Sequence, residues 1–573
     1  MILENKILVQ IKKYAVPSVV IVLLFIACYL TSFASLFPDE IAYKIFLERY
    51  FLNGGLKQTV TPYCEGEFLL APGLFLIPAA AIWSLVTKLG TSYFSYRFLS
   101  YVGLFTIFAV LATVNLQKGR NGFWPLLLLV TFGPVLYGIT LFRPEIVILT
   151  SSVVLYALGH SMLYDTKPWP VIIKSFFALL IFDLCLYMHP RAVYMGLIIA
   201  GLVGIGVMKQ SGRYQKIAYG CICAVLIAVM TSQALELNGK QFMQCHSSLP
   251  EIEAHFSDLM QSHAANPMDL IKNPPHFFSN LAATVSEPSL QKGLNGVLYQ
   301  TIYQDNFLPR KDLLTEWDKS ANVMTVVVII GYLGYIFYKV FICFRRLKDK
   351  VEKTRLVFVS LVIISLLVPI CFSIVKQFYE ISFLVFSLMV SATLLYSFLI
   401  PETGQETAPK TRGLIAIVHN MFCIVMIGGS IICCALSYNN FTIGFKKGFV
   451  GPGVGYNTDW EALSARIQFA LRNASIGQDE PLFVDDLTYG AVRNHPLVIS
   501  VSHFSLIAGV LPRAIRYYSV ERGIRYGVMR CKYSSIFEGY NVRFTVLERI
   551  PVIIKDPTVI APEANTECVF KLE

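Results

Sequence analysis

The sequence has few charged residues and lacks the short motifs of several enzyme classes. Charged residues make up 15% of its 573 residues, whereas soluble domains carry about 25%. There is no internal repeat and no Walker loop, GxGxxG, HExxH or GxSxG motif. Hydrophobic residues reach 55%. This composition excludes a disordered chain, a collagen, a disulfide miniprotein and an ordinary cytosolic enzyme, and it predicts a membrane protein.

The cysteines lack a metal-binding pattern. None of the 13 forms a CxxC pair, which argues against a zinc ribbon. Nine lie in or beside apolar runs and are expected to be small packing residues. The other four lie in polar segments: Cys64, Cys245, Cys531 and Cys568. A Cys531–Cys568 bridge is compatible with the sequence, but the spacing does not determine the pairing.

Long apolar runs dominate the chain. A spanning helix needs about 20 mainly apolar residues, because lipid offers the backbone no hydrogen bonds. Eleven runs qualify: 15–36, 98–116, 123–141, 146–164, 171–188, 192–208, 217–235, 323–344, 356–375, 378–400 and 413–436. The first follows three lysines and exceeds a signal-peptide core, so it predicts a retained anchor. The expected fold class is a polytopic α-helical membrane protein with about 11 transmembrane helices.

A further apolar stretch, residues 68–89, decides the topology. Pro72, Gly73 and Pro78 interrupt it. If it does not cross the membrane, all the Lys/Arg clusters between spans fall on the cytoplasmic side, as the positive-inside rule requires. If it crosses, every cluster after the first moves outward. We therefore interpret residues 68–89 as a membrane-surface or re-entrant helix.

This topology divides the chain into two parts. Residues 1–436 form a multi-span catalytic module, with outer loops at 37–96 and 236–322. Residues 437–573 follow a Gly-rich linker and are expected to form a small extracytoplasmic α/β domain. An amphipathic helix is predicted at 460–472, and strands are predicted at 481–486, 497–501, 542–547 and 552–555.

Three ionic motifs fall on the same outer face. They are Pro38-Asp39-Glu40, Arg143-Pro144-Glu145 and His189-Pro190-Arg191, and Arg97 at the outer start of the second span joins them. Each alone has a structural explanation: an acid at a helix N-terminus, a snorkelling arginine, or a histidine bonded to a loop carbonyl. Together they predict a functional site. Ionisable groups are costly to place near a bilayer unless a partner or a ligand compensates for the lost hydration. Arginines bind phosphate bidentately, and a carboxylate can deprotonate a nucleophile.

The first third of the chain resembles the GT-C membrane glycosyltransferases, such as protein O-mannosyltransferases and lipid A aminoarabinose transferases. The matching segments are Phe37-Pro38-Asp39-Glu40-Ile41-Ala42-Tyr43, Gly54-Gly55, Pro62, Glu65-Gly66-Glu67-Phe68-Leu69-Leu70-Ala71-Pro72-Gly73 and Arg97-Phe98-Leu99-Ser100. In that family an Asp-Glu follows the first span and a Tyr follows three residues later, as Tyr43 does here. The family's Lys-Pro-Pro-Leu segment is Leu70-Ala71-Pro72-Gly73, so its lysine is missing. The His-Pro-Arg motif has no assigned counterpart.

The resemblance implies an inverting transferase that moves a sugar from a polyprenyl-phosphate donor to a hydroxyl of a lipid, glycan or protein. The expected catalytic residues are Asp39 as base, with Glu40 and Glu145 orienting the acceptor or a metal. The expected substrate-binding residues are Tyr43, Lys57, Arg97, Arg143, His189 and Arg191. A divalent cation, Mg or Mn, is compatible with carboxylate ligands from Asp39 and Glu145. The expected location is a bacterial inner membrane, with the site on the periplasmic face and no nucleic-acid partner.

Two other functions remain open from the sequence. An O-antigen ligase or polymerase would share the lipid-linked substrate and use a large outer loop, and residues 236–322 contain four histidines: His246, His255, His263 and His276. A transporter or flippase would place charges at mid-depth in a span, as Asp183 is placed. The acidic pair Asp485-Asp486, at the end of a predicted strand, is better explained as an Asx turn than as a metal or sugar site.

Overall fold

The structure is a computed structural model, and it describes about two fifths of the chain. The described residues are 18–26, 28, 93–116, 126, 139–243, 350–372, 383, 386–387, 389–391, 393–395, 460–484, 488–492, 495, 498–500, 523–531, 537–538, 542–551 and 566–573. The predicted spans 323–344 and 413–436, the surface helix 68–89 and most of both outer loops lie outside these residues.

Six long helices occupy the described part of the first 436 residues. They are α4 (Tyr93–Leu116), α7 (Pro144–Tyr164), α8 (Pro168–Met188), α9 (Gly196–Lys209), α10 (Arg213–Met243) and α17 (Lys350–Phe372). A short 3-10 helix, η3 (Pro190–Met195), joins α8 to α9. Helices α4, α7, α8 and α10 each contain a segment that is long and apolar enough to cross a membrane, and a fifth such segment, Arg191–Lys209, combines most of η3 with α9. The protein is a polytopic helical membrane protein, and these five segments confirm five of the predicted spans.

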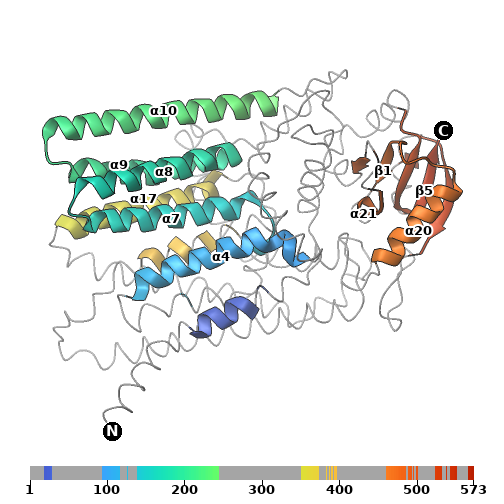
Figure 1. The fold of residues 1–573 in the computed structure, drawn as a ribbon, viewed down its shortest axis with the longest axis horizontal. Helices are drawn as coiled ribbons and strands as arrows, with labels where there is room; N and C mark the ends of the chain where they lie inside the picture. Colours follow the sequence, from blue (N-terminus) through green and yellow to red (C-terminus); the bar gives the residue numbers. More distant parts are fainter. Residues whose placement is uncertain are drawn as a thin grey trace, which may run out of the picture.

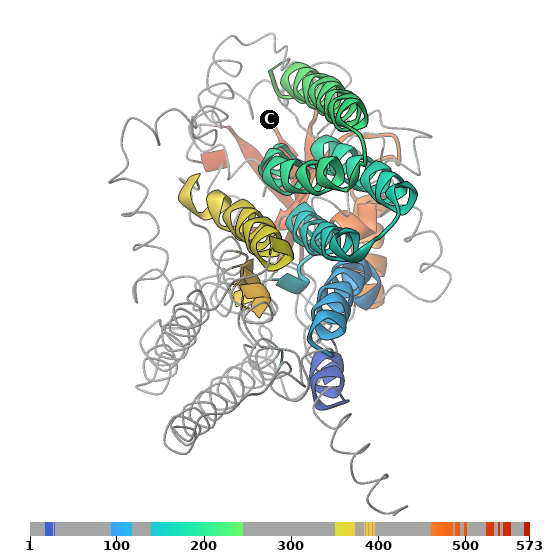
Figure 2. The same ribbon diagram turned by 90° about the vertical axis from the view of Figure 1, so that its left-hand side faces the viewer.

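The helices pack side by side with their axes roughly along one direction (Figure 1). Helix α7 packs against α4, α8, α9 and α17, and the view along the bundle shows it among them, with α10 at the margin (Figure 2). Side chains of α10 such as Ile217, Ile222 and Val225 are exposed. Lipid would cover such a face, because hydrocarbon chains are as apolar as these side chains.

Phe358 of α17 joins three helices at the centre of the bundle. Its ring is stacked on Tyr156 of α7, with the planes 5° apart. A Cβ added at Gly159 of α7 would overlap this ring, and a Cβ at Gly201 of α9 would come within 2.8 Å of it. The two glycines therefore allow the close approach of α7, α9 and α17, because any larger residue would occupy the volume of the ring.

Replacing Gly159 with alanine is expected to destabilise the bundle by about 1–3 kcal/mol, the usual cost of overpacking a dense core. Gly204→Ala on α9 is the matched control, because nothing lies within 4 Å of a Cβ added there and alanine favours a helix over glycine. Thermal unfolding in detergent measures both. An unchanged transition temperature for Gly159→Ala would contradict the packing described above.

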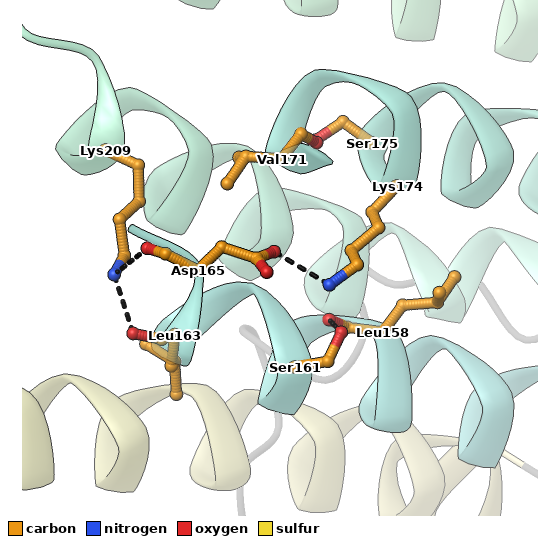
Figure 3. A network of polar contacts seen from close by, with 8 residues as sticks. All are labelled: Leu158, Ser161, Leu163, Asp165, Val171, Lys174, Ser175 and Lys209. Carbon is orange, nitrogen blue, oxygen red and sulfur yellow. Dashed lines mark hydrogen bonds and ion pairs between the residues drawn. The ribbon is translucent and has the colours of Figure 1, made fainter. Parts of the chain in front are cut away.

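At one end of the bundle, a polar network joins α7, α8 and α9 (Figure 3). Lys209 Nζ donates to the carbonyl oxygens of Leu163, at 2.6 Å, and Asp165, at 2.9 Å. The carboxylate of Asp165 bonds Lys174 Nζ at 2.7 Å. A lysine at the C-terminal end of a helix satisfies carbonyls that have no partner within the helix. The sequence placed Lys209 on the cytoplasmic side but did not indicate this capping role.

The C-terminal part contains a mixed five-stranded sheet in the order β2-β1-β3-β5-β4. The strands are β1 (Leu482–Val484), β2 (Val498–Ser500), β3 (Tyr526–Arg530), β4 (Phe544–Ile550) and β5 (Glu567–Leu572), with helices α20 (Trp460–Asn473) and α21 (Tyr489–Val492). Strand β1 is parallel to β2 and β3, whereas β5 is antiparallel to β3 and β4. The predicted helix and three predicted strands are present, β3 and β5 were not predicted, and 552–555 lies outside the described residues.

A disulfide joins Cys531, which directly follows β3, to Cys568 of β5. Cys568 is completely buried. Backbone pairing aligns the two strands, with Met529 opposite Cys568 and Arg530 opposite Glu567. The pairing that the sequence left open is thus present, and it fixes the β3–β5 register at the centre of the sheet.

Candidate functional site

The candidate site lies where α7 begins and α8 ends. Arg143 precedes Pro144, and its backbone is extended, with φ −142° and ψ 151°. This conformation follows from the sequence, because a residue before proline is driven out of the helical region. Proline then occupies the first turn of α7 and Glu145 follows it, where an acid is favoured by the helix dipole.

Arg143 and Glu145 form a buried bidentate ion pair. Arg143 Nε donates to Oε2 at 3.0 Å and Nη2 donates to Oε1 at 2.9 Å. The two side chains are only 8% and 9% exposed. Both carboxylate oxygens of Glu145 are thus bonded to one guanidinium, the strong fork geometry of an arginine–carboxylate pair.

A second arginine approaches the same carboxylate from the start of η3. Arg191 Nη1 lies 3.6 Å from Glu145 Oε1, which is an ion pair but longer than a hydrogen bond. The side chain of Arg191 is 38% exposed. Ser365 of α17 donates to the carbonyl of Tyr194 at 2.7 Å and holds η3 against the bundle. Two cations therefore share one buried carboxylate, and the more exposed cation is Arg191.

His189 caps η3 and completes the cluster. Its ring Nδ1 accepts a hydrogen bond from the backbone N–H of Arg191 at 3.1 Å. The side chain is half-buried. Burial lowers the pKa of His189 to about 4; Arg191 and Arg143 lower it further, whereas Glu145 acts in the opposite direction. His189 is therefore neutral around pH 7.

This depressed pKa predicts a loss of stability at mildly acidic pH. The unfolded chain takes up a proton on His189 near its ordinary pKa of about 6.5, whereas the folded protein does so near 4. Between these values the unfolded state binds more protons, so stability falls as the pH drops. Thermal unfolding from pH 7 to pH 4.5 should show this slope, and His189→Asn should reduce it. An identical slope in that variant would contradict the assignment.

Of the other expected site residues, only Arg97 is described. It is completely buried near the start of α4. One turn later, Ser100 Oγ donates to the carbonyl of Leu141 at 2.7 Å, which attaches α4 to the segment just before Arg143. Four expected site residues lie outside the described part of the chain: Asp39, Glu40, Tyr43 and Lys57. The structure therefore brings together Arg143, Glu145, His189 and Arg191.

The geometry shows which partner Glu145 has. Both of its oxygens accept hydrogen bonds from Arg143, and its role in orienting an acceptor or a metal stays a prediction. Within the described residues, no group of three or more His, Cys, Asp or Glu side chains could hold a metal ion. Asp39, the other expected ligand of a divalent cation, lies outside the described residues, so the cation stays a prediction and no step of the reaction is assigned to it. The signal for the ion pair was present in the sequence as Arg-Pro-Glu.

Asp183, the acid expected from its position within a span, lies on α8. Its Oδ1 is buried and has no hydrogen-bond partner. The side chain belongs to the flank of α8, between the buried Phe182 and the exposed Leu184. The structure shows no ion pair for it among the described residues, and Asp183 is not part of the cluster around Glu145.

Comparison with solved structures establishes the fold. A crystal structure of ArnT from Cupriavidus metallidurans bound to undecaprenyl phosphate is similar, with a TM-score of 0.52, 14% identity and 97% of each chain covered. The chain has the ArnT fold. The apo structure of the same protein matches with a TM-score of 0.49, 12% identity and 97% of each chain covered. No family model and no curated protein sequence matches the chain.

ArnT is a lipid A aminoarabinose transferase of the GT-C superfamily, so the GT-C-like fold expected from the sequence is confirmed. The ArnT fold extends over 97% of the chain, whereas the sequence resemblance covered only the first third. The Arg-Pro-Glu and His-Pro-Arg motifs therefore belong to a fold in which a solved structure holds a polyprenyl phosphate.

Proposed function

We propose that this protein is an integral-membrane glycosyltransferase. It moves a sugar from a polyprenyl-phosphate donor to an acceptor hydroxyl on the extracytoplasmic face, with inversion at the anomeric carbon. The observation that carries the proposal is the cluster of Arg143, Glu145, His189 and Arg191 at one end of a bundle with the ArnT fold. The ArnT crystal structure that matches with a TM-score of 0.52 contains undecaprenyl phosphate. This supports a polyprenyl-phosphate donor for the present protein.

The charge of the cluster suits a departing phosphate. Two guanidinium groups and one carboxylate leave one net positive charge when His189 is neutral. A sugar polyprenyl phosphate is a diester with one negative charge, and the released monoester carries a second. Fixed cations lower the barrier most where they face charge that develops during the reaction. The net positive charge of the cluster therefore stabilises the released phosphate, with two negative charges, more than the intact donor, with one.

The proposed reaction is a single displacement. The acceptor oxygen forms a bond to the anomeric carbon on one face while the bond to the phosphate oxygen breaks on the other. Asp39 takes the proton of the acceptor hydroxyl, and the electron pair of the broken bond stays on polyprenyl phosphate. Arg191, the more exposed arginine, faces that phosphate, and Glu145 keeps Arg143 and Arg191 in place. Arg97, Tyr43 and Lys57 remain proposed donor contacts.

The disulfide supports an extracytoplasmic site. A Cys531–Cys568 bridge persists in an oxidising compartment and is rare in the cytosol. The sheet lies beyond one end of the helices, and the α9–α10 turn lies at the opposite end (Figure 1). Since α9 runs from η3 to that turn, the His189 cluster is at the end that faces the sheet. We propose that residues 437–573 form a domain over the periplasmic face of a bacterial inner membrane.

A transfer assay with purified protein tests the proposal. The protein in lipid nanodiscs would receive a polyprenyl-phosphate sugar labelled in the sugar, together with an envelope extract that supplies lipid, glycan and protein acceptors. We expect label to leave the donor and appear in one acceptor fraction, with free polyprenyl phosphate released in equal amount. NMR of the product would show the inverted anomeric configuration.

Three outcomes would contradict the proposal. Label that stays on the donor with every acceptor fraction would exclude transfer. Movement of intact donor across liposome membranes without any glycosyl product would favour a flippase instead. If the product forms but a chain with outer loop residues 246–322 shortened is inactive while Asp39→Asn is active, the ligase or polymerase reading is the better one.

A further inference from the structure

The hydrogen bonds of His189 determine where its proton lies. Nδ1 accepts from the backbone N–H of Arg191 at 3.1 Å, so this nitrogen carries no hydrogen. A neutral imidazole has one donor and one acceptor nitrogen. The proton is therefore on Nε2. The structure gives this ring no other hydrogen bond within the described part of the chain.

The surroundings of His189 keep the ring in this form. The backbone N–H of His189 bonds the carbonyl of Cys185, the last turn of α8, at 3.0 Å, and its own carbonyl accepts from Ala192 at 2.9 Å. The residue is thus held on both sides by backbone bonds, and the ring has little freedom to turn. Arg191 is the second residue of η3, which begins at Pro190, so the ring and the more exposed guanidinium belong to one turn.

We propose that His189 Nε2–H donates a hydrogen bond to an oxygen of the donor's phosphate group, next to Arg191. This inference rests on the proposed function and assigns the His-Pro-Arg motif a specific task within it. The proline keeps the turn short, the imidazole supplies a neutral donor, and the arginine supplies charge. His189 is thereby a binding residue and takes no part in proton transfer.

A neutral donor has an advantage at this place. A third full positive charge beside Arg143 and Arg191 would be repelled by both, whereas an N–H dipole is not. The carboxylate of Glu145 already accepts from Arg143. Burial and the two arginines oppose protonation of the ring. His189 thus offers a directional contact to a phosphate oxygen without changing the charge of the cluster.

Two substitutions separate the two nitrogens of the ring. His189→Asn keeps an oxygen near the position of Nδ1, where asparagine is a favoured N-cap, but removes the distal N–H. His189→Gln places an amide N–H near the position of Nε2 but loses the cap. Binding of undecaprenyl phosphate to each protein in nanodiscs is the measurement, with undecaprenol as the uncharged control. Inorganic phosphate is a second probe, and thermal unfolding reports the cap.

We expect His189→Asn to bind undecaprenyl phosphate about tenfold more weakly than the wild type, the loss of one hydrogen bond to a charged group. His189→Gln should bind more tightly than His189→Asn and unfold at a lower temperature. Undecaprenol should bind all three proteins equally. A loss for undecaprenyl phosphate that inorganic phosphate does not show would assign the contact to the lipid-linked headgroup, and equal losses for both probes would assign it to the phosphate itself; both support the donor role.

Several results would overturn the inference. Unchanged binding by His189→Asn, or weaker binding by His189→Gln than by His189→Asn, would make His189 a cap without a ligand. Equal losses of binding in the two variants would also make His189 a cap without a ligand. Both variants replace the whole ring, but only His189→Gln keeps a distal N–H. If the wild-type protein itself does not discriminate undecaprenyl phosphate from undecaprenol, the proposed function fails. If it does discriminate but His189→Asn binds undecaprenyl phosphate as tightly as the wild type, only the present inference fails.

Discussion

Replacing Glu145 with alanine is expected to lower the stability of the bundle by about 3–5 kcal/mol, the cost of removing one partner from a buried ion pair. Arg143 is only 8% exposed on its side chain, and it donates to both oxygens of Glu145. Without the carboxylate, Arg143 and Arg191 would lose the counter-charge that they share. Unfolding in detergent, followed by heat or by SDS, measures the change.

The matched control for Glu145→Ala is the double variant Arg143→Met/Glu145→Leu. Replacing both partners with apolar side chains leaves neither member of the buried Arg143–Glu145 pair behind, and Arg191, at 38% exposure, remains accessible to water. Replacements of this kind are often neutral or stabilising. We expect this variant to recover most of the stability but to lose donor binding. If Glu145→Ala were as stable as the wild type, the ion pair would not be the element that holds the start of α7, and the positioning role of Glu145 would be wrong.

Replacing Asp39 with asparagine is expected to reduce sugar transfer by about 10²–10⁴-fold, the range that a positioned general base contributes. Asparagine has nearly the same shape but cannot take the proton of the acceptor hydroxyl. The measurement is the rate of label transfer from the lipid-linked donor. Binding of undecaprenyl phosphate should stay at the wild-type level, because the phosphate contacts are assigned to other residues.

The control for Asp39→Asn is Asp479→Asn. Asp479 is exposed in the turn between α20 and β1, far in the sequence from the proposed site, and the same change there should leave transfer unaltered. Near-normal transfer by Asp39→Asn would remove Asp39 from the role of base and direct attention to Glu40. Loss of both transfer and binding would indicate instead that Asp39 supports the structure of the donor site.

The helices could be predicted from the sequence because each consists of an apolar run with a charged or proline boundary. Helix α7 begins at Pro144 and α8 begins at Pro168, two and three residues before the predicted runs 146–164 and 171–188. The closeness of α7, α9 and α17 could not be predicted. It depends on Gly159 and Gly201 receiving the ring of Phe358, a contact between residues about 150–200 positions apart in the sequence.

In the C-terminal part, strands with strong apolar runs were predicted, and others were not. β1 and β2 are short and apolar, and both were found at their predicted places. β3 has the sequence Tyr-Gly-Val-Met-Arg and ends in a completely buried arginine, so its composition does not distinguish it from a loop. Its state is determined by pairing with β1 on one side and β5 on the other.

The site was predictable as a gathering of ionic motifs but not as a network. Counting spans placed Arg-Pro-Glu and His-Pro-Arg at the same end, and the 3.6 Å approach of Arg191 to Glu145 shows them in contact. The sequence does not state which carboxylate meets which arginine, because that depends on the extended backbone of Arg143 and the turn at η3. The ion pair of Glu145 with Arg143 was therefore not predicted, and its expected acceptor or metal role stays a prediction.

The position of β5 has a consequence for biosynthesis. β4 precedes β5 along the chain, yet β4 joins the sheet only through β5, which lies between it and β3. During synthesis, β4 therefore cannot take its place beside the other described strands until β5 has been made and has paired with β3. The Cys531–Cys568 bridge also needs β5, because Cys568 belongs to it, so the sheet and its disulfide are completed late.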